Sequence, residues 1–177
     1  MKKRIFTIVQ NTLISIFLPF LLYYVMTTVC QKESLDTISF VIYYCILILF
    51  IFTFSIYQCE KIQDFLGHKI GQMKFICSIC YILLSLSLIF TSYYFCLYID
   101  NPLNFNNVSK GNIFEQYYDF FFYSLGIFVM NNQSSIESTS FYAKLFVSTE
   151  ILTVFVLLVV IFANYKELNN PFNEHTK

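Results

Sequence analysis

Few side chains in this sequence have the type and spacing that chemistry needs. Cys77 and Cys80 form a Cys-x-x-Cys pair, the spacing found in redox and metal sites. Glu150 is the one ionisable residue inside a long apolar run, and such residues usually face a cavity or a partner. The two histidines, His68 and His175, form no ligand cluster, and no phosphate-binding loop or nucleophile motif is present. We therefore expect no metal site, no cofactor and no catalytic residue.

The Cys77–Cys80 pair supports one enzymatic alternative, a four-helix membrane thiol oxidoreductase. No basic residue inside the same apolar segment would activate a thiolate, and no second pair lies in a loop to exchange with it. Buried cysteines more often fill small apolar spaces. The pair on its own therefore does not predict an enzyme, and the redox function stays an alternative.

The composition shows which elements must position these residues. The chain has 177 residues, of which 57% are hydrophobic, 20% aromatic and 12% charged. Soluble domains carry roughly 25% charged residues, and a chain this small could not hide so much apolar surface. The formal net charge of +0 argues against a nucleic-acid-binding protein. The composition therefore predicts a membrane protein.

Charged residues are absent from long stretches of the chain. A helix needs about 20 apolar residues to cross a bilayer, where the backbone must satisfy its own hydrogen bonds. Four segments meet this condition, namely about 5–29, 38–58, 75–98 and 142–164. The fold class we expect is an all-α membrane protein with four transmembrane helices.

The basic residues predict the orientation of these helices. Four spans put both termini on one side, together with most of the basic residues: Lys2, Lys3, Arg4, Lys61, Lys69, Lys74, Lys166 and Lys177. By the positive-inside rule this side is cytoplasmic, so we expect a multi-pass protein of the plasma (inner) membrane with both termini inside. The outer side carries an excess of acids: Glu33, Asp36, Asp100, Glu115, Asp119 and Glu137.

The chain divides into three parts by its pattern of apolar runs and loops. Residues 1–74 predict a two-helix membrane hairpin followed by an amphipathic cytoplasmic linker over 59–74, either a short interfacial helix or a simple connector. Residues 75–165 hold the last two spans and the long loop between them, and 166–177 form a short cytoplasmic tail.

The segment between the last two spans is too apolar for an exposed loop and too short to cross. Its aromatic run covers 117–129, and a polar stretch of amides and serines follows. Such a run predicts a re-entrant helix, because irregular backbone at membrane depth persists only inside protein or beside a water-filled cavity. The alternative is an aromatic hairpin that rests on the outer leaflet.

This segment resembles the pore module of the tetrameric potassium-channel superfamily. Tyr123-Ser124-Leu125 is similar to the pore-helix pattern of the family, 138–146 to the entrance of its inner helix, and Glu150-Ile151-Leu152 to that helix itself. The resemblance covers roughly residues 75–164. It implies an outer helix, a pore helix, a filter-like loop and an inner helix, assembled as a homotetramer that passes monovalent cations.

The position of the filter departs from the family pattern. Family filters use glycines to turn successive carbonyls inward. Here the sequence is Val129-Met130-Asn131-Asn132-Gln133, with no glycine. These residues predict either a wider cation path lined by amide side chains or a dry, non-conducting vestibule.

Glu150 has three interpretations in this setting. It contacts ions in the pore, it supports the pore helix together with Tyr123 and Ser124, or it is a carboxyl hydrogen-bonded to Ser or Tyr between helices. The expected function is thus a cation channel-like, pore-forming membrane protein with membrane lipid, monovalent cations and further copies of itself as partners. A non-conducting membrane subunit with a pore-like fold is the alternative.

Overall fold

The computed structural model describes Leu13 and residues 16–25, 27–28, 37–66, 72–130 and 134–168. Nearly all of this is helix. The elements are α2 (Thr37–Leu66), α3 (Gln72–Asp100), the 3-10 turn η1 (Pro102–Asn104), β1 (Phe105–Asn106), α4 (Ile113–Phe128), β2 (Glu137–Ser138) and α5 (Phe141–Leu168).

Three of these helices are long and apolar enough to cross a membrane, so the fold is an all-α membrane protein. The apolar windows are Thr37–Phe54, Ile79–Asp100 and Phe141–Phe162. They coincide with the last three of the four spans expected from the gaps between charges. The first expected span, 5–29, is described only at residue 13 and over 16–25 and 27–28, and this part includes a shorter apolar helix, Ile16–Val25.

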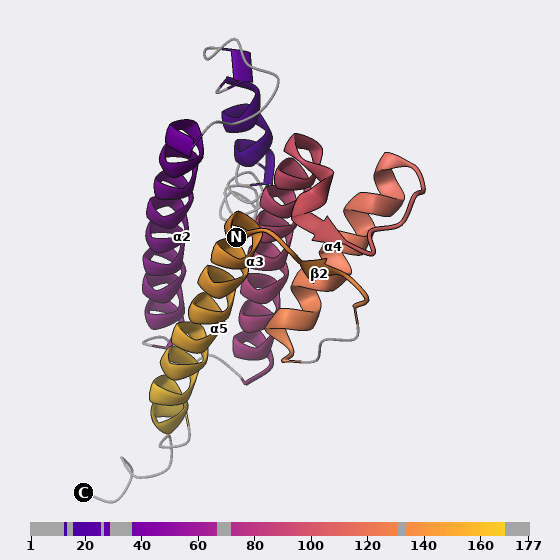
Figure 1. Ribbon diagram of the computed structural model, residues 1–177. Coiled ribbons are helices and arrows are strands. Elements are labelled where there is room, and N and C mark those ends of the chain that lie inside the picture. Colours follow the sequence, from indigo (N-terminus) through magenta and orange to yellow (C-terminus); the bar gives the residue numbers. More distant parts are fainter. Residues whose placement is uncertain are drawn as a thin grey trace, which may run out of the picture.

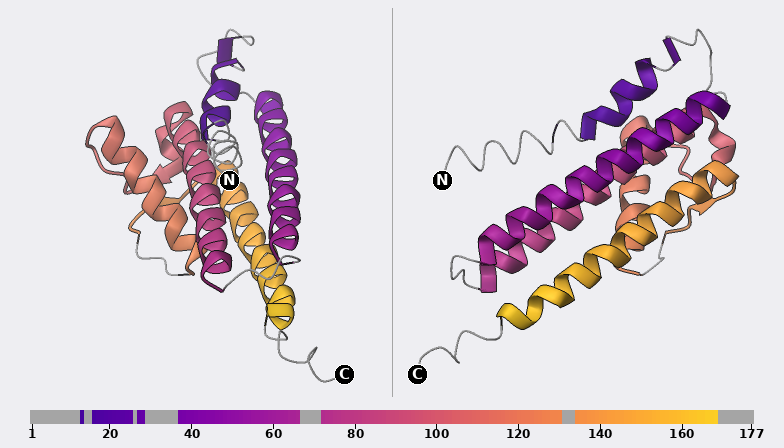
Figure 2. Two further views of the ribbon diagram at one scale, coloured as in Figure 1. Left: turned by 180° about the vertical axis from the view of Figure 1, so that it is seen from behind. Right: turned by 90° about the vertical axis from the view of Figure 1, so that its left-hand side faces the viewer.

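The three long helices run side by side, and α3 is the central one. In Figures 1 and 2, α2 and α4 lie on opposite sides of α3. Of the apolar window of α3, 72% is buried, against 33% for α2 and 22% for α5. Helix α3 is therefore the scaffold against which the other helices pack.

Aromatic rings fill the junction between α2, α3 and α5. The ring centroids of Tyr43 and Tyr93 are 5.1 Å apart, and those of Tyr93 and Phe146 are 5.7 Å apart. These edge-to-face and tilted contacts are the geometry that aromatic pairs prefer. Because one residue comes from each helix, this cluster sets how the three helices meet.

A small sheet joins the chain that leaves α3 to the chain that enters α5. Strands β1 and β2 pair antiparallel, with Phe105 opposite Ser138 and Asn106 opposite Glu137. The Thr139 N–H also donates to the Asn104 carbonyl at 3.0 Å. The two ends of the 105–138 segment are therefore fastened together at one end of the helix bundle.

The expected linker over 59–74 does not start as a helix of its own. Helix α2 continues without a break through Leu66, and α3 begins at Gln72. Residues 67–71, which include His68 and Lys69, lie outside the described part. The tail, from residue 169 onward, and the N-terminal residues 1–12 also lie outside it.

Candidate functional site

Helix α4 begins with a well-formed cap. The Asn112 side chain accepts a hydrogen bond from the Glu115 N–H at 3.0 Å, and its own amide points back to the Glu115 carboxylate at 3.4 Å. The first of these bonds satisfies a backbone N–H that a helix start would leave without a partner, and the second holds the two side chains together. The Asp119 carboxylate adds a bond from the Ser109 N–H at 3.0 Å, which holds the preceding turn against α4.

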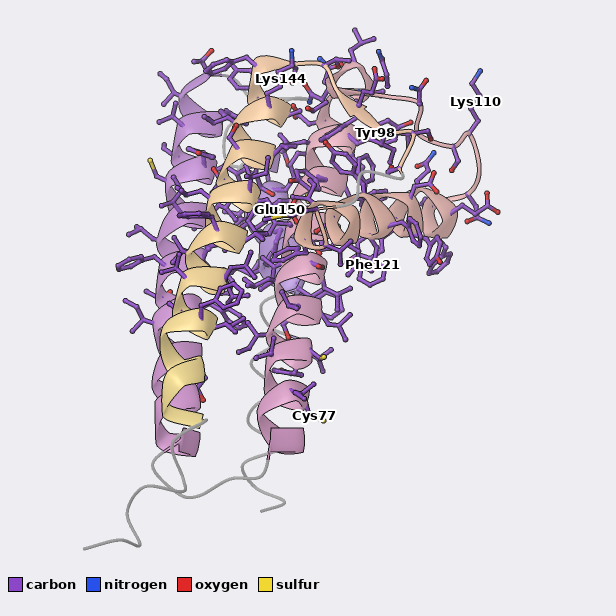
Figure 3. All side chains as sticks on the ribbon, turned by 90° about the horizontal axis from the view of Figure 1, so that it is seen from below. Cys77, Tyr98, Lys110, Phe121, Lys144 and Glu150 are labelled. Carbon is purple, nitrogen blue, oxygen red and sulfur yellow. The ribbon has the colours of Figure 1, made fainter. Side chains whose placement is uncertain are left out.

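The helix runs obliquely past α3 in Figure 1, and in Figure 3 it lies across the bundle and ends beside Glu150. In the middle of α4, the ring of Phe120 lies 5.5 Å from that of Tyr98, which is two residues before the end of α3. At the C-terminal end of α4, Phe128 lies 6.3 Å from Phe90, well inside the apolar window of α3. The C-terminal half of α4 therefore packs against the middle of a helix that is long enough to span a membrane.

A buried carboxyl fixes α4 at this level. Glu150 of α5 is 0% exposed, and its two oxygens accept hydrogen bonds from two other helices. The Ser124 hydroxyl of α4 donates to Oε1 at 2.5 Å, and the Tyr94 hydroxyl of α3 donates to Oε2. Burying a carboxyl is costly unless it is hydrogen-bonded, and both of its oxygens have a partner here.

The sequence places Glu150 toward the interior by helical spacing. The buried positions of α5 recur every three or four residues, a single stripe along the helix: Ala143, Phe146, Glu150, Val154 and Leu157. Glu150 occupies the middle of that stripe. Its carboxyl therefore faces α3 and α4 within the chain, as Figure 3 shows for its place beside the end of α4.

The structure brings together the three residues expected to support the helix. Ser124 is hydrogen-bonded to Glu150, and its hydroxyl also lies 3.2 Å from the Ser87 carbonyl of α3. Tyr123 is 4% exposed, with its ring 5.5 Å from that of Tyr94. All of them lie in one buried layer between α3, α4 and α5.

The residues expected to line a pore are described only in part. Val129 and Met130 follow the end of α4 and are 65% and 70% exposed. The N–H of Met130 donates to the Ile127 carbonyl at 3.1 Å, and Met130 has the left-handed φ of 53° that usually falls to glycine at this position. Asn131, Asn132 and Gln133 lie outside the described residues.

The cysteine pair lies far from this layer. Cys77 and Cys80 are free and exposed near the start of α3, at the end of the bundle away from Lys144 and Lys110 in Figure 3. Within the described part of the chain, no three His, Cys, Asp or Glu residues lie close enough together to hold a metal ion.

Two partners in the buried layer carry no signal in the sequence. Tyr94 is one of 14 tyrosines, and nothing in its neighbours marks it as a partner of Glu150. The Ser87 carbonyl accepts from Ser124 and, at 2.7 Å, from the Thr91 hydroxyl. Because backbone acceptors of this kind depend on how helices cross, sequence spacing does not reveal them.

Comparison with family models, curated proteins and solved structures finds no match to this chain. The resemblance to a potassium-channel pore module remains a hypothesis carried by the residues quoted above.

Proposed function

We propose that this chain is a pore-forming subunit of a cation channel-like membrane protein, with four transmembrane helices and α4 as a re-entrant pore helix. One observation carries the proposal. The chain leaves α3 and enters α5 at the same end of the bundle, fastened by the pairing of β1 with β2, while α4 reaches the middle of both helices in between. A segment that enters and returns on one side of a membrane has this connectivity.

The end of α4 is suited to a water-filled path. Irregular backbone within a bilayer requires burial in protein or contact with water, and the residues after Phe128 leave the helix. The C-terminus of a helix also carries a partial negative charge, which favours cations nearby. Acidic residues of the outer segment, Glu115, Asp119 and Glu137, add negative charge on the side from which α4 enters.

In this proposal the path is lined by Val129, Met130, Asn131, Asn132 and Gln133. Without a glycine to turn successive carbonyls inward, amide side chains would line the path in place of a carbonyl ring, so we expect a wider and less selective path. One chain supplies one α4, so several copies must surround the path, and the resemblance suggests four. Both termini then face the cytoplasm of a plasma (inner) membrane protein.

A non-conducting membrane subunit is the second candidate. The exposed side chains of Val129 and Met130 favour it, because apolar groups at a constriction exclude water. In that case α4 and its supporting layer would serve assembly rather than conduction.

Ion flux into liposomes separates the two. The purified protein is reconstituted under a potassium gradient, and flux is compared with that of empty vesicles. We expect flux above background, changed by Asn132→Ala and unchanged by Asn106→Ala, an exposed asparagine in β1. A folded oligomer that gives no flux contradicts the channel function and favours the non-conducting subunit.

A further inference from the structure

We infer that the outward face of α4 in one copy packs against the outward face of α5 in the next copy. This inference rests on the proposed function and specifies the partner of the same site. The outward face of α4 consists of Phe114, Glu115, Tyr118 and Phe122. The outward face of α5 consists of Lys144, Ser148, Ile151, Phe155 and Val159.

The outward face of α4 is an aromatic stripe with no partner helix in the described part of its own chain. The residues of α4 that are buried, Phe120, Tyr123, Ser124 and Phe128, all lie on the opposite side. Phe114, Tyr118 and Phe122 follow one another at intervals of four and are 86%, 60% and 48% exposed. That spacing puts them on one line along the helix.

The outward face of α5 has the same character. Ile151, Phe155 and Val159 recur every four residues and are 54%, 61% and 52% exposed. They lie opposite the buried stripe that holds Glu150. The two outward faces belong to different helices and point away from the contact that joins these helices, so they cannot meet within one chain.

The order of charges along the two faces is complementary. Each face is apolar except toward the outer end, where α4 has the exposed carboxylate of Glu115 and α5 has the exposed ammonium of Lys144. Glu115 precedes Ser124 by nine residues, about 2.5 helical turns, and Lys144 precedes Glu150 by six residues, about 1.7 turns, so both charges lie on the same side of the Ser124–Glu150 hydrogen bond. No acid of the described ranges forms an ion pair with Lys144, so it is available to a neighbouring copy.

A neighbouring copy suits these faces better than lipid does. Val129 is 65% exposed beside the last turn of α4, where carbonyls lack partners within the helix. Lipid cannot hydrogen-bond to these groups or shield the turn that follows, whereas a second protein surface can. Because the two faces differ, the contact is heterologous, and a heterologous contact whose rotation closes generates a ring.

Cysteine cross-linking tests the inference directly. Tyr118→Cys and Ser148→Cys are combined in a chain whose native cysteines are replaced by alanine, and the membranes are oxidised. We expect a ladder of covalent oligomers up to the full ring from the double variant, and only dimers when the two single variants are mixed. Tyr118→Cys paired with Ile48→Cys, an exposed position on α2, is the matched control and should give no ladder.

Charge reversal provides a second measurement that does not depend on added cysteines. Lys144→Glu places two acids together at the contact, and we expect it to lower the oligomer yield about tenfold, with a smaller effect from Lys144→Gln. Lys110→Glu, on the exposed turn before α4, should leave the yield unchanged.

The outcomes separate the inference from the proposed function. A conducting oligomer that gives no ladder, and whose yield is unchanged by Lys144→Glu, overturns the interface and leaves the channel function standing. High-yield dimers from Tyr118→Cys alone or Ser148→Cys alone would show a two-fold contact between like faces and also overturn it. A ladder without flux in liposomes supports the interface and contradicts the channel.

Discussion

Ser124 of α4 and Glu150 of α5 are joined by a 2.5 Å hydrogen bond, although they lie 26 residues apart and both are completely buried. Tyr94 of α3 donates to the other oxygen of the same carboxyl. One side chain therefore connects three helices, two of them long enough to span a membrane. This explains how a 16-residue helix is held at one level of the bundle.

We predict that Glu150→Ala lowers the free energy of unfolding by about 2–4 kcal/mol, because it leaves a cavity and removes the acceptor of the Tyr94 hydroxyl. The Ser124 hydroxyl is not left without an acceptor, because it can still donate to the Ser87 carbonyl. Glu150→Gln keeps the volume and one acceptor, so its effect should be smaller. Unfolding in mixed micelles, followed by circular dichroism, gives both values. Leu152→Ala on the exposed side of α5 is the control, and equal losses at both positions would contradict a supporting role for Glu150.

Tyr94 and Tyr93 form a matched pair for a hydroxyl deletion. Both are 0% exposed on α3, but the Tyr94 hydroxyl is bonded to Glu150, whereas that of Tyr93 has no hydrogen-bond partner among the residues that the structure describes. We predict that Tyr94→Phe destabilises the fold by about 1–2 kcal/mol, because Glu150 loses a donor. Tyr93→Phe removes an unsatisfied buried hydroxyl and should be neutral or stabilising. The same unfolding measurement compares the two, and a larger loss at Tyr93 would show that the bond to Glu150 contributes little.

Charge gaps in the sequence were sufficient to predict the three long helices, because a membrane-spanning helix requires an uncharged run of known length. Ser124 and Glu150 could be singled out as well, one by resemblance and the other as an ionisable residue in an apolar run. The choice of Tyr94 among many aromatic residues, the pairing of β1 with β2 and the continuation of α2 through Leu66 could not. Each of these depends on how distant segments pack, and short spacing patterns carry no information about it.

Met130 offers a test of backbone strain at the end of α4. Its φ of 53° lies in the left-handed region, which costs a residue with a side chain roughly 1–2 kcal/mol. Glycine adopts this conformation freely but loses more entropy on folding. We predict that Met130→Gly raises the free energy of unfolding by about 0.5–1 kcal/mol, whereas Met130→Val lowers it because a β-branched side chain is poorly tolerated there. If Met130→Gly destabilises the fold, contacts of the Met130 side chain stabilise it by more than the left-handed backbone conformation destabilises it.

The cap at the other end of α4 makes a separate contribution. Asn112 accepts the Glu115 N–H through its side chain while the first turn of α4 is exposed, so the helix start depends on this bond rather than on packing. We predict that Asn112→Ala costs about 1 kcal/mol, and that Asn112→Asp costs less, because it keeps the acceptor and adds a negative charge at the positive end of the helix, although it faces the Glu115 carboxylate that the Asn112 amide now contacts. Amide hydrogen exchange of the first turn of α4 is the most specific measurement. We expect faster exchange there in Asn112→Ala, with the amides around Ser124 unchanged because Glu150 still holds that part of the helix. Equal acceleration along the whole of α4 would mean that the cap and the buried carboxyl form one cooperative unit instead of two independent attachments.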